Sequence, residues 1–129
     1  SAPFAISIAN APTPPAISVS YQQTCGYTGS WATTTTLASG QQFLISAPWL
    51  DVNGAEALLN GPSAANVVLS RVCTPAGGAG EYLLGFNMPA GLTPGTYTLQ
   101  MRSSIVDGFG VPLPGRTGAW GPTYSIIVP

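Results

Sequence analysis

The sequence predicts an all-β protein, folded as an antiparallel β-sandwich of about seven to eight short strands with Greek-key connections. Three observations support this fold class. Stretches in which apolar and polar residues alternate recur along the chain, at the period that marks a strand with one buried face. Glycine and proline, with 16 and 13 copies in 129 residues, separate these stretches as turn residues do. No stretch has the apolar spacing of a helix of useful length.

The clearest strand lies in residues 92–102. Pro94 and Gly95 predict a turn, because proline fixes φ and glycine accepts positive φ. From Tyr97 onward, apolar side chains occupy every second position and are therefore expected on a buried face. The pattern Leu-x-Pro-Gly-x-Tyr is typical of a tyrosine corner, in which the tyrosine hydroxyl bonds to the backbone just upstream. We therefore expect Tyr97 to be buried in the penultimate strand.

The N-terminal third predicts further strands. Residues 4–9 alternate as a first strand, and residues 10–15 contain three prolines that predict a linker or bend. Residues 17–21 alternate again. Residues 31–37 are rich in β-branched threonine, which favours a strand, and a Ser-Gly turn leads from them into the alternating residues 42–46. We expect these last two segments to form a hairpin.

The middle of the chain breaks the strand pattern. Within residues 47–65, Ala55–Leu59 predicts a single helical turn, which the following Asn-Gly-Pro closes. The strand pattern resumes in three later stretches, residues 66–73, 81–87 and 124–128. Before the last of these, Asp107–Pro122 is a glycine- and proline-rich loop, longer than a hairpin requires.

Composition limits the domain count and the classes of partner. We expect one domain over residues 1–129, with residues 1–13 as an additional N-terminal strand and linker. Charged residues make up 5% of the chain, against a usual figure of about 25%, and the formal net charge is −1. Such a chain offers no positive field to nucleic acid. Its apolar runs are far shorter than the ~20 residues that cross a bilayer. We expect neither a nucleic-acid partner nor membrane insertion.

The chain has two cysteines, Cys25 and Cys73, each near the end of an expected strand. An even count in a lysine-free β protein favours one disulfide. The alternative is a pair of buried thiols. A disulfide implies an oxidising compartment, so we expect a secreted or cell-surface protein.

The residue types exclude most catalytic chemistry. Because the chain has no histidine, it has no Ser-His-Asp triad, no Cys-His pair and no imidazole metal site. Its four carboxylates lie in separate loops or strand starts, at Asp51, Glu56, Glu81 and Asp107. A catalytic pair needs two carboxylates on one substrate, so solvated surface groups are the better interpretation. We expect a protein that is not an enzyme and has no cofactor.

Residues 51–56 have the oxygen-bearing pattern Asp-Val-Asn-Gly-Ala-Glu, which is partly that of a calcium loop. Ala55 stands where a third oxygen ligand belongs, and no glutamate follows at the twelfth position. An Asx-turn explains the same residues, so we expect no metal site.

Three landmarks resemble a known family. Pro15–Ser20 has an opening Pro-x-Ile strand, Ser39–Ser46 has a glycine followed by an alternating strand, and Pro94–Met101 has a late Gly-x-Tyr strand. Their order over residues 14–129 resembles that of IPT/TIG-type, early-set immunoglobulin-like domains. The resemblance implies an immunoglobulin-like sandwich. It also implies a non-catalytic extracellular module, often one domain of a longer surface protein or an appendage to an enzyme.

Aromatic residues supply the candidate binding site. Tryptophans lie beside hydrogen-bonding side chains in the two longest connections, and loops at the ends of a sandwich commonly carry binding. The candidate ligand-binding residues are Trp49, Asp51, Asn53, Asp107, Phe109, Arg116 and Trp120. These rings either plug the ends of the core, form a seam with another domain, or bind a ligand. We expect a binding or structural module that contacts a protein or glycan surface or neighbouring domains. The alternative is a carbohydrate-binding module attached to a secreted hydrolase.

Overall fold

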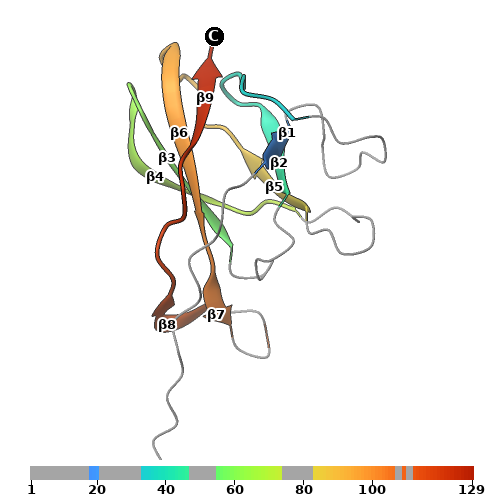
Figure 1. Cartoon of the computed structure of the whole chain (residues 1–129), viewed down its shortest axis with the longest axis vertical. Coiled ribbons are helices and arrows are strands. Elements are labelled where there is room, and N and C mark those ends of the chain that lie inside the picture. The colour runs from blue at the N-terminus through green and yellow to red at the C-terminus, as the bar shows by residue number, and fades with distance from the viewer. Residues whose placement is uncertain (1–17, 21–32, 47–54, 74–82, 107–108, 110–111) are drawn as a thin grey trace, which may run out of the picture.

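The computed structural model describes residues 18–20, 33–46, 55–73, 83–106, 109 and 112–129 (Figure 1). Within these ranges the chain forms strands and no helix. In chain order they are β1 (Ser18–Ser20), β2 (Gln42–Ser46), β3 (Glu56–Gly61), β4 (Ala64–Ser70), β5 (Leu83–Asn87), β6 (Gly95–Arg102), β7 (Ser104–Val106), β8 (Pro112–Thr117) and β9 (Tyr124–Val128). Every pairing between these strands is antiparallel.

Two sheets form the sandwich. One has the strand order β1-β2-β5 and the other has the order β4-β3-β6-β9. The short sheet β7-β8 lies at one end, beyond β6 (Figure 1). The predicted all-β sandwich is confirmed. Two connections between the sheets, β2–β3 and β4–β5, run through residues outside the described ranges, so the Greek-key connections stay a prediction.

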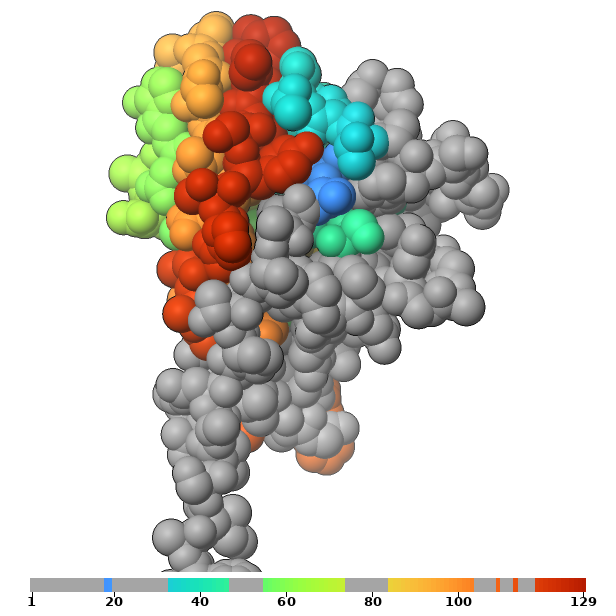
Figure 2. Space-filling model, in the orientation of Figure 1, coloured from blue at the N-terminus to red at the C-terminus, as the bar shows by residue number. Residues whose placement is uncertain are grey.

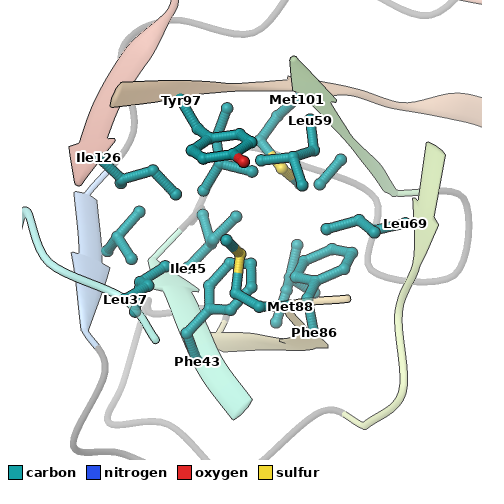
Figure 3. Close-up of a cluster of buried hydrophobic side chains, with 14 of the residues drawn as sticks. Leu37, Phe43, Ile45, Leu59, Leu69, Phe86, Met88, Tyr97, Met101 and Ile126 are labelled. Carbon is teal, nitrogen blue, oxygen red and sulfur yellow. The ribbon is translucent and has the colours of Figure 1, made fainter. Parts of the chain in front are cut away.

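The core lies between the facing sheets. Figure 3 shows Leu59, Tyr97, Met101 and Ile126 from the four-stranded sheet opposite Phe43, Ile45 and Phe86 from the other. All of these side chains are completely buried. The rings of Phe43 and Phe86 stack with centroids 5.9 Å apart. Burying a side chain of this size contributes about 1.5–3 kcal/mol, so apolar burial between the sheets is the main stabilising force.

The tyrosine corner is confirmed. Tyr97 is buried, and its hydroxyl donates to the carbonyl oxygen of Thr93 at 2.6 Å. Ser63 completes the arrangement, because its Oγ lies 2.7 Å from the Tyr97 hydroxyl and accepts the Thr93 N–H at 2.9 Å. The single phenol proton goes to Thr93, so Ser63 is the donor to Tyr97. The turn between β3 and β4 is thereby tied to the start of β6.

Two glycines make this corner possible. A Cβ on Gly61 would lie 2.1 Å from Cδ2 of Tyr97, so the tyrosine ring packs directly on the glycine backbone. Gly95 has φ +152°, in the region that side-chain-bearing residues rarely adopt. The predicted turn at Pro94 and Gly95 therefore depends on glycine.

The predicted helical turn at Ala55–Leu59 is wrong, because residues 56–61 form strand β3. The residues themselves are good helix formers. β3 nevertheless lies in the middle of its sheet, hydrogen-bonded to β4 on one side and β6 on the other. Ala57 and Leu59 are completely buried in the core. Tertiary pairing has overridden the local preference.

The predicted hairpin between residues 31–37 and 42–46 is also wrong. Residues 33–37 pair with β9 instead, through a parallel bridge between Thr36 and Ile127. The Leu37 N–H donates to the Ile127 carbonyl at 3.0 Å, and the Ile127 N–H donates to the Thr35 carbonyl at 2.7 Å. β2 pairs with β1 and β5.

The predicted loop over residues 107–122 contains strand β8, which pairs with β7. The strand predicted at 66–73 is β4, which begins at Ala64 and ends at Ser70. A bulge interrupts its start, where Asn66 has φ 50° and donates its N–H to Oδ1 of Asn60 at 2.7 Å.

The other expected strands agree with the structure where it describes them. β1, β5, β6 and β9 lie in the predicted segments, and the side chains of β6 alternate between core and surface as predicted. The strand expected at 4–9 and the linker at 10–15 lie outside the described residues. So does Cys25, which leaves the Cys25–Cys73 disulfide a prediction.

Candidate functional site

The candidate site lies at the end of the sandwich where β3 begins and β6 ends. Glu56 and Arg102 are directly opposite each other in the β3–β6 pairing. The Arg102 guanidinium donates from Nη2 and Nε to one carboxylate oxygen of Glu56, at 2.9 and 3.0 Å. Both side chains are partly exposed, so solvent screening limits the stability that the pair contributes to about 1 kcal/mol or less. Its main consequence is to hold the guanidinium in one orientation.

Trp120 lies against this ion pair. Cζ of Arg102 is 4.2 Å from the centroid of the Trp120 ring, a cation–π contact. The tryptophan is partly exposed. One face of the indole is therefore covered by the guanidinium, while part of the ring remains in contact with solvent.

The backbone before β9 is fixed along β6. The Gly118 N–H donates to the Ser103 carbonyl at 2.9 Å, and the Gly121 N–H donates to the Met101 carbonyl at 2.8 Å. The Gln100 side-chain amide donates to the Gly121 carbonyl at 2.9 Å. These bonds flank Trp120 on both sides, so the ring is held at its place before any partner binds. We call Glu56, Arg102 and Trp120 the Trp120 cluster.

β7 and β8 form a ribbon beyond the Trp120 cluster, because β7 begins two residues after Arg102. Phe109, between these two strands, is 94% exposed. A phenylalanine in water forgoes about 1.5–3 kcal/mol of burial free energy, so it is a strong candidate for contact with a partner. Trp120 and Phe109 thus belong to the same connection between β6 and β9, Phe109 between β7 and β8 and Trp120 after β8.

The charged residues of the described segments gather at this end. Glu56 and Arg102 form the ion pair, Arg71 directly follows the last residue of β4, and Arg116 lies in the ribbon strand β8. The turns at the other end of the sandwich, at residues 38–41, 61–64 and 88–95, contain no charged residue. The two ends of the sandwich therefore present different surfaces.

The structure describes only some of the predicted site residues. Trp49, Asp51, Asn53 and Asp107 lie outside the described segments. Arg116 is placed in β8 by its backbone. Phe109 is exposed, and its predicted role in binding stays a prediction.

Trp120 contacts Arg102, a residue that the sequence analysis did not select. Sequence reasoning missed Arg102 and Glu56 as neighbours of Trp120. The sequence did show that Arg102 is the last polar residue of a predicted strand. Which residues it contacts depended on the pairing of that strand with β3, which the sequence did not show.

Burial raises the pKa of the Tyr124 hydroxyl above the ordinary value of 10.0, although a hydrogen bond with the Val19 backbone opposes the shift. Its hydroxyl donates to the Thr34 carbonyl at 2.5 Å, which fastens residues 33–37 to β9. Its role is structural.

The described residues contain no group of three or more histidine, cysteine, aspartate or glutamate side chains that would hold a metal ion. They also contain no helix long and apolar enough to cross a membrane. Comparison with family models, curated proteins and solved structures found no match to this chain.

Proposed function

We propose that this domain is a non-catalytic binding or structural module, acting in adhesion or in contacts between domains. The observation that carries the proposal is the exposure of Phe109, at 94%, on a ribbon next to the Trp120 cluster. Aromatic and arginine side chains are enriched among the residues that dominate binding free energies. Here they share one end of a rigid sandwich.

Preorganisation supports the same proposal. Ordering a flexible side chain at an interface costs about 0.5–1.5 kcal/mol. Trp120 avoids much of this cost, because Arg102 stacks on its ring and its flanking backbone is bonded to β6. The proposed partner residues also include Trp49, Asp51 and Asn53, which precede β3 in the sequence and lie outside the described residues.

We also propose that the domain acts outside the cell or on its surface. Support comes from the expected Cys25–Cys73 disulfide, which needs an oxidising compartment. A chain with no lysine and only 5% charged residues suits a domain that is one part of a larger surface assembly. Of the two candidate partners, a protein surface and a glycan, we propose the protein surface first.

The direct test compares Phe109→Ala and Trp120→Ala with Ile127→Ala. Ile127 is an exposed apolar residue on β9, away from the ribbon, and serves as the matched control. We would measure binding of the labelled domain to immobilised extracellular matrix proteins and to a glycan array, with thermal melting of the same variants. The aromatic variants should lose about tenfold or more in affinity, while Ile127→Ala should not. Binding that survives both aromatic changes would contradict the proposal.

A carbohydrate-binding module attached to a secreted hydrolase is the second candidate. The partly exposed indole of Trp120 favours it, because aromatic faces stack on sugar rings. Since Arg102 covers one face of the indole, a sugar would stack on the other. Glycan binding that is lost in Trp120→Ala and kept in Phe109→Ala would select this candidate over a protein partner.

A further inference from the structure

Three of the four sheet edges in the sandwich are bonded by other parts of the described chain. Beside β9, residues 35–37 exchange backbone hydrogen bonds with Ile127. Beside β1, the Thr34 N–H donates to the Val19 carbonyl at 2.8 Å. Beside β5, Val72 and Cys73 bond to both backbone groups of Gly85. Open strand edges promote pairing with other chains, and these contacts reduce that exposure.

The fourth edge is β4. It pairs with β3 on one side, and no backbone hydrogen bond between described residues reaches it from the other. The segment that contains β3 and β4 forms the margin of the molecule in Figure 2. Ala65, Val68 and Ser70 are exposed, Val68 at 44%. Among the described residues, this edge therefore has no backbone partner beyond β3, and Val68 adds an exposed apolar side chain to the strand.

We propose that β4 pairs with β4 of a second copy of this chain, antiparallel across a twofold axis. The two four-stranded sheets would then join into one continuous sheet. A contact of this kind is isologous and closes on itself, giving a dimer and not a fibre. The inference is independent of the proposed function, because β4 is not part of the Trp120 cluster or the ribbon.

The sequence of β4 supports a second copy as the occupant. In a twofold pairing, β4 of one copy lies beside β4 of the other. A charged side chain on β4 would therefore lie near the identical charge of the second copy. Residues 64–70, Ala-Ala-Asn-Val-Val-Leu-Ser, contain none. Proline and charged residues, lysine above all, commonly protect an exposed edge, and this strand contains neither. The net charge of −1 adds little repulsion between copies.

Side-chain alternation restricts the register. Directly opposite residues share one face of a sheet, so Leu69, which faces the core, must lie opposite another core-facing residue. The register that places Val68 opposite its counterpart satisfies this condition, with Val67 opposite Leu69. The bulge at Asn66 leaves only Val67–Ser70 as regular strand. The pairing is short, so we expect a weak dimer with a Kd on the order of 0.1–1 mM.

Sedimentation equilibrium of the full chain, up to about 1 mM, tests the proposal. Val68→Lys should raise the dimer Kd about tenfold or more, because two lysines would face each other across the axis. Ser125→Lys is the matched control, since Ser125 is exposed on β9 at the other side of the same sheet and should leave the Kd unchanged. High salt should partly restore the Val68→Lys dimer. A wild-type chain that stays monomeric, or equal effects of the two lysines, would overturn the proposal.

A cross-link provides a second measurement that does not depend on charge. Cα atoms of directly opposite residues lie about 4.5–5.5 Å apart, within the range of a disulfide. Val68→Cys should therefore form a covalent dimer under mild oxidation, whereas Val72→Cys, equally exposed beyond the end of β4, should not. Equal cross-linking of the two variants would indicate random collision and would overturn the β4 pairing. Circular dichroism melting of each variant checks that the fold is kept.

Discussion

At the scale of single residues, Tyr97 links local sequence to long-range structure. Its ring is buried on Gly61, and its hydroxyl joins Thr93 and Ser63 in a closed set of hydrogen bonds. Thr93 and Tyr97 are close in sequence, which made the corner predictable. Ser63 comes from the β3–β4 turn, and nothing near it in sequence indicated this contact.

Tyr97→Phe should keep the packed ring and remove the hydroxyl. The Ser63 hydroxyl and the Thr93 carbonyl would each lose a partner, so we expect the free energy of unfolding to fall by about 1–3 kcal/mol. Urea denaturation measures this change. Ser63→Ala in the Tyr97→Phe background should cost less than Ser63→Ala alone, and strictly additive effects would contradict the shared network.

The raised pKa of Tyr124 predicts how the free energy of unfolding changes at alkaline pH. Burial raises the pKa of its hydroxyl above 10.0, so the folded state favours the neutral phenol more than the unfolded state does. Its contribution to stability is then fully present below about pH 10 and is lost as pH rises through the raised pKa. Unfolding free energies from pH 8 to pH 12 should fall less steeply for Tyr124→Phe than for wild type. Parallel curves for the two proteins would contradict this assignment.

At the scale of elements, the β3–β4 turn should not tolerate a side chain at Gly61. Gly61→Ala places a Cβ 2.1 Å from the Tyr97 ring, which is fixed by its own hydrogen bonds. We expect a loss of about 3 kcal/mol or more in unfolding free energy, measured by denaturation. Gly40→Ala is the control, since its Cβ meets nothing within 4 Å and only its positive φ is strained. It should cost about 1 kcal/mol, and equal losses would argue against the close packing.

β3 also shows why helix propensity gave a wrong prediction for residues 55–59. Ala-Glu-Ala-Leu-Leu favours a helix in isolation. In the sheet it supplies Ala57 and Leu59 to the core and pairs with strands on both sides. A central strand gains more from this burial and pairing than the few tenths of a kcal/mol per residue by which helix propensities differ.

At the scale of the whole molecule, the expected Cys25–Cys73 disulfide encloses a large part of the chain. If it forms, mass spectrometry without reductant should detect no free thiol. Cys73→Ala should lower the unfolding free energy by about 2–5 kcal/mol, because the unfolded chain would regain the freedom that the loop removes. Alkylation of both cysteines in the native protein would disprove the disulfide.

The sequence by itself determined the all-β class, β6 and β9, and the tyrosine corner. Each of these follows from local patterns, because alternation and a turn beside a tyrosine are set by neighbouring residues. It also pointed to Phe109 and Trp120 as candidate binding residues, of which the structure leaves Phe109 exposed and Trp120 partly exposed.

The tertiary structure alone decided which strands are neighbours. Residues 33–37 joined β9 instead of β2, and Trp120 lies against Arg102, a contact that the sequence did not indicate. The edge left open at β4 is likewise a property of the whole sandwich. These outcomes depend on hydrogen bonds and packing between segments far apart in the chain. Any of several strands can satisfy the same alternating pattern, and only the complete sandwich selects the pairing that buries the core.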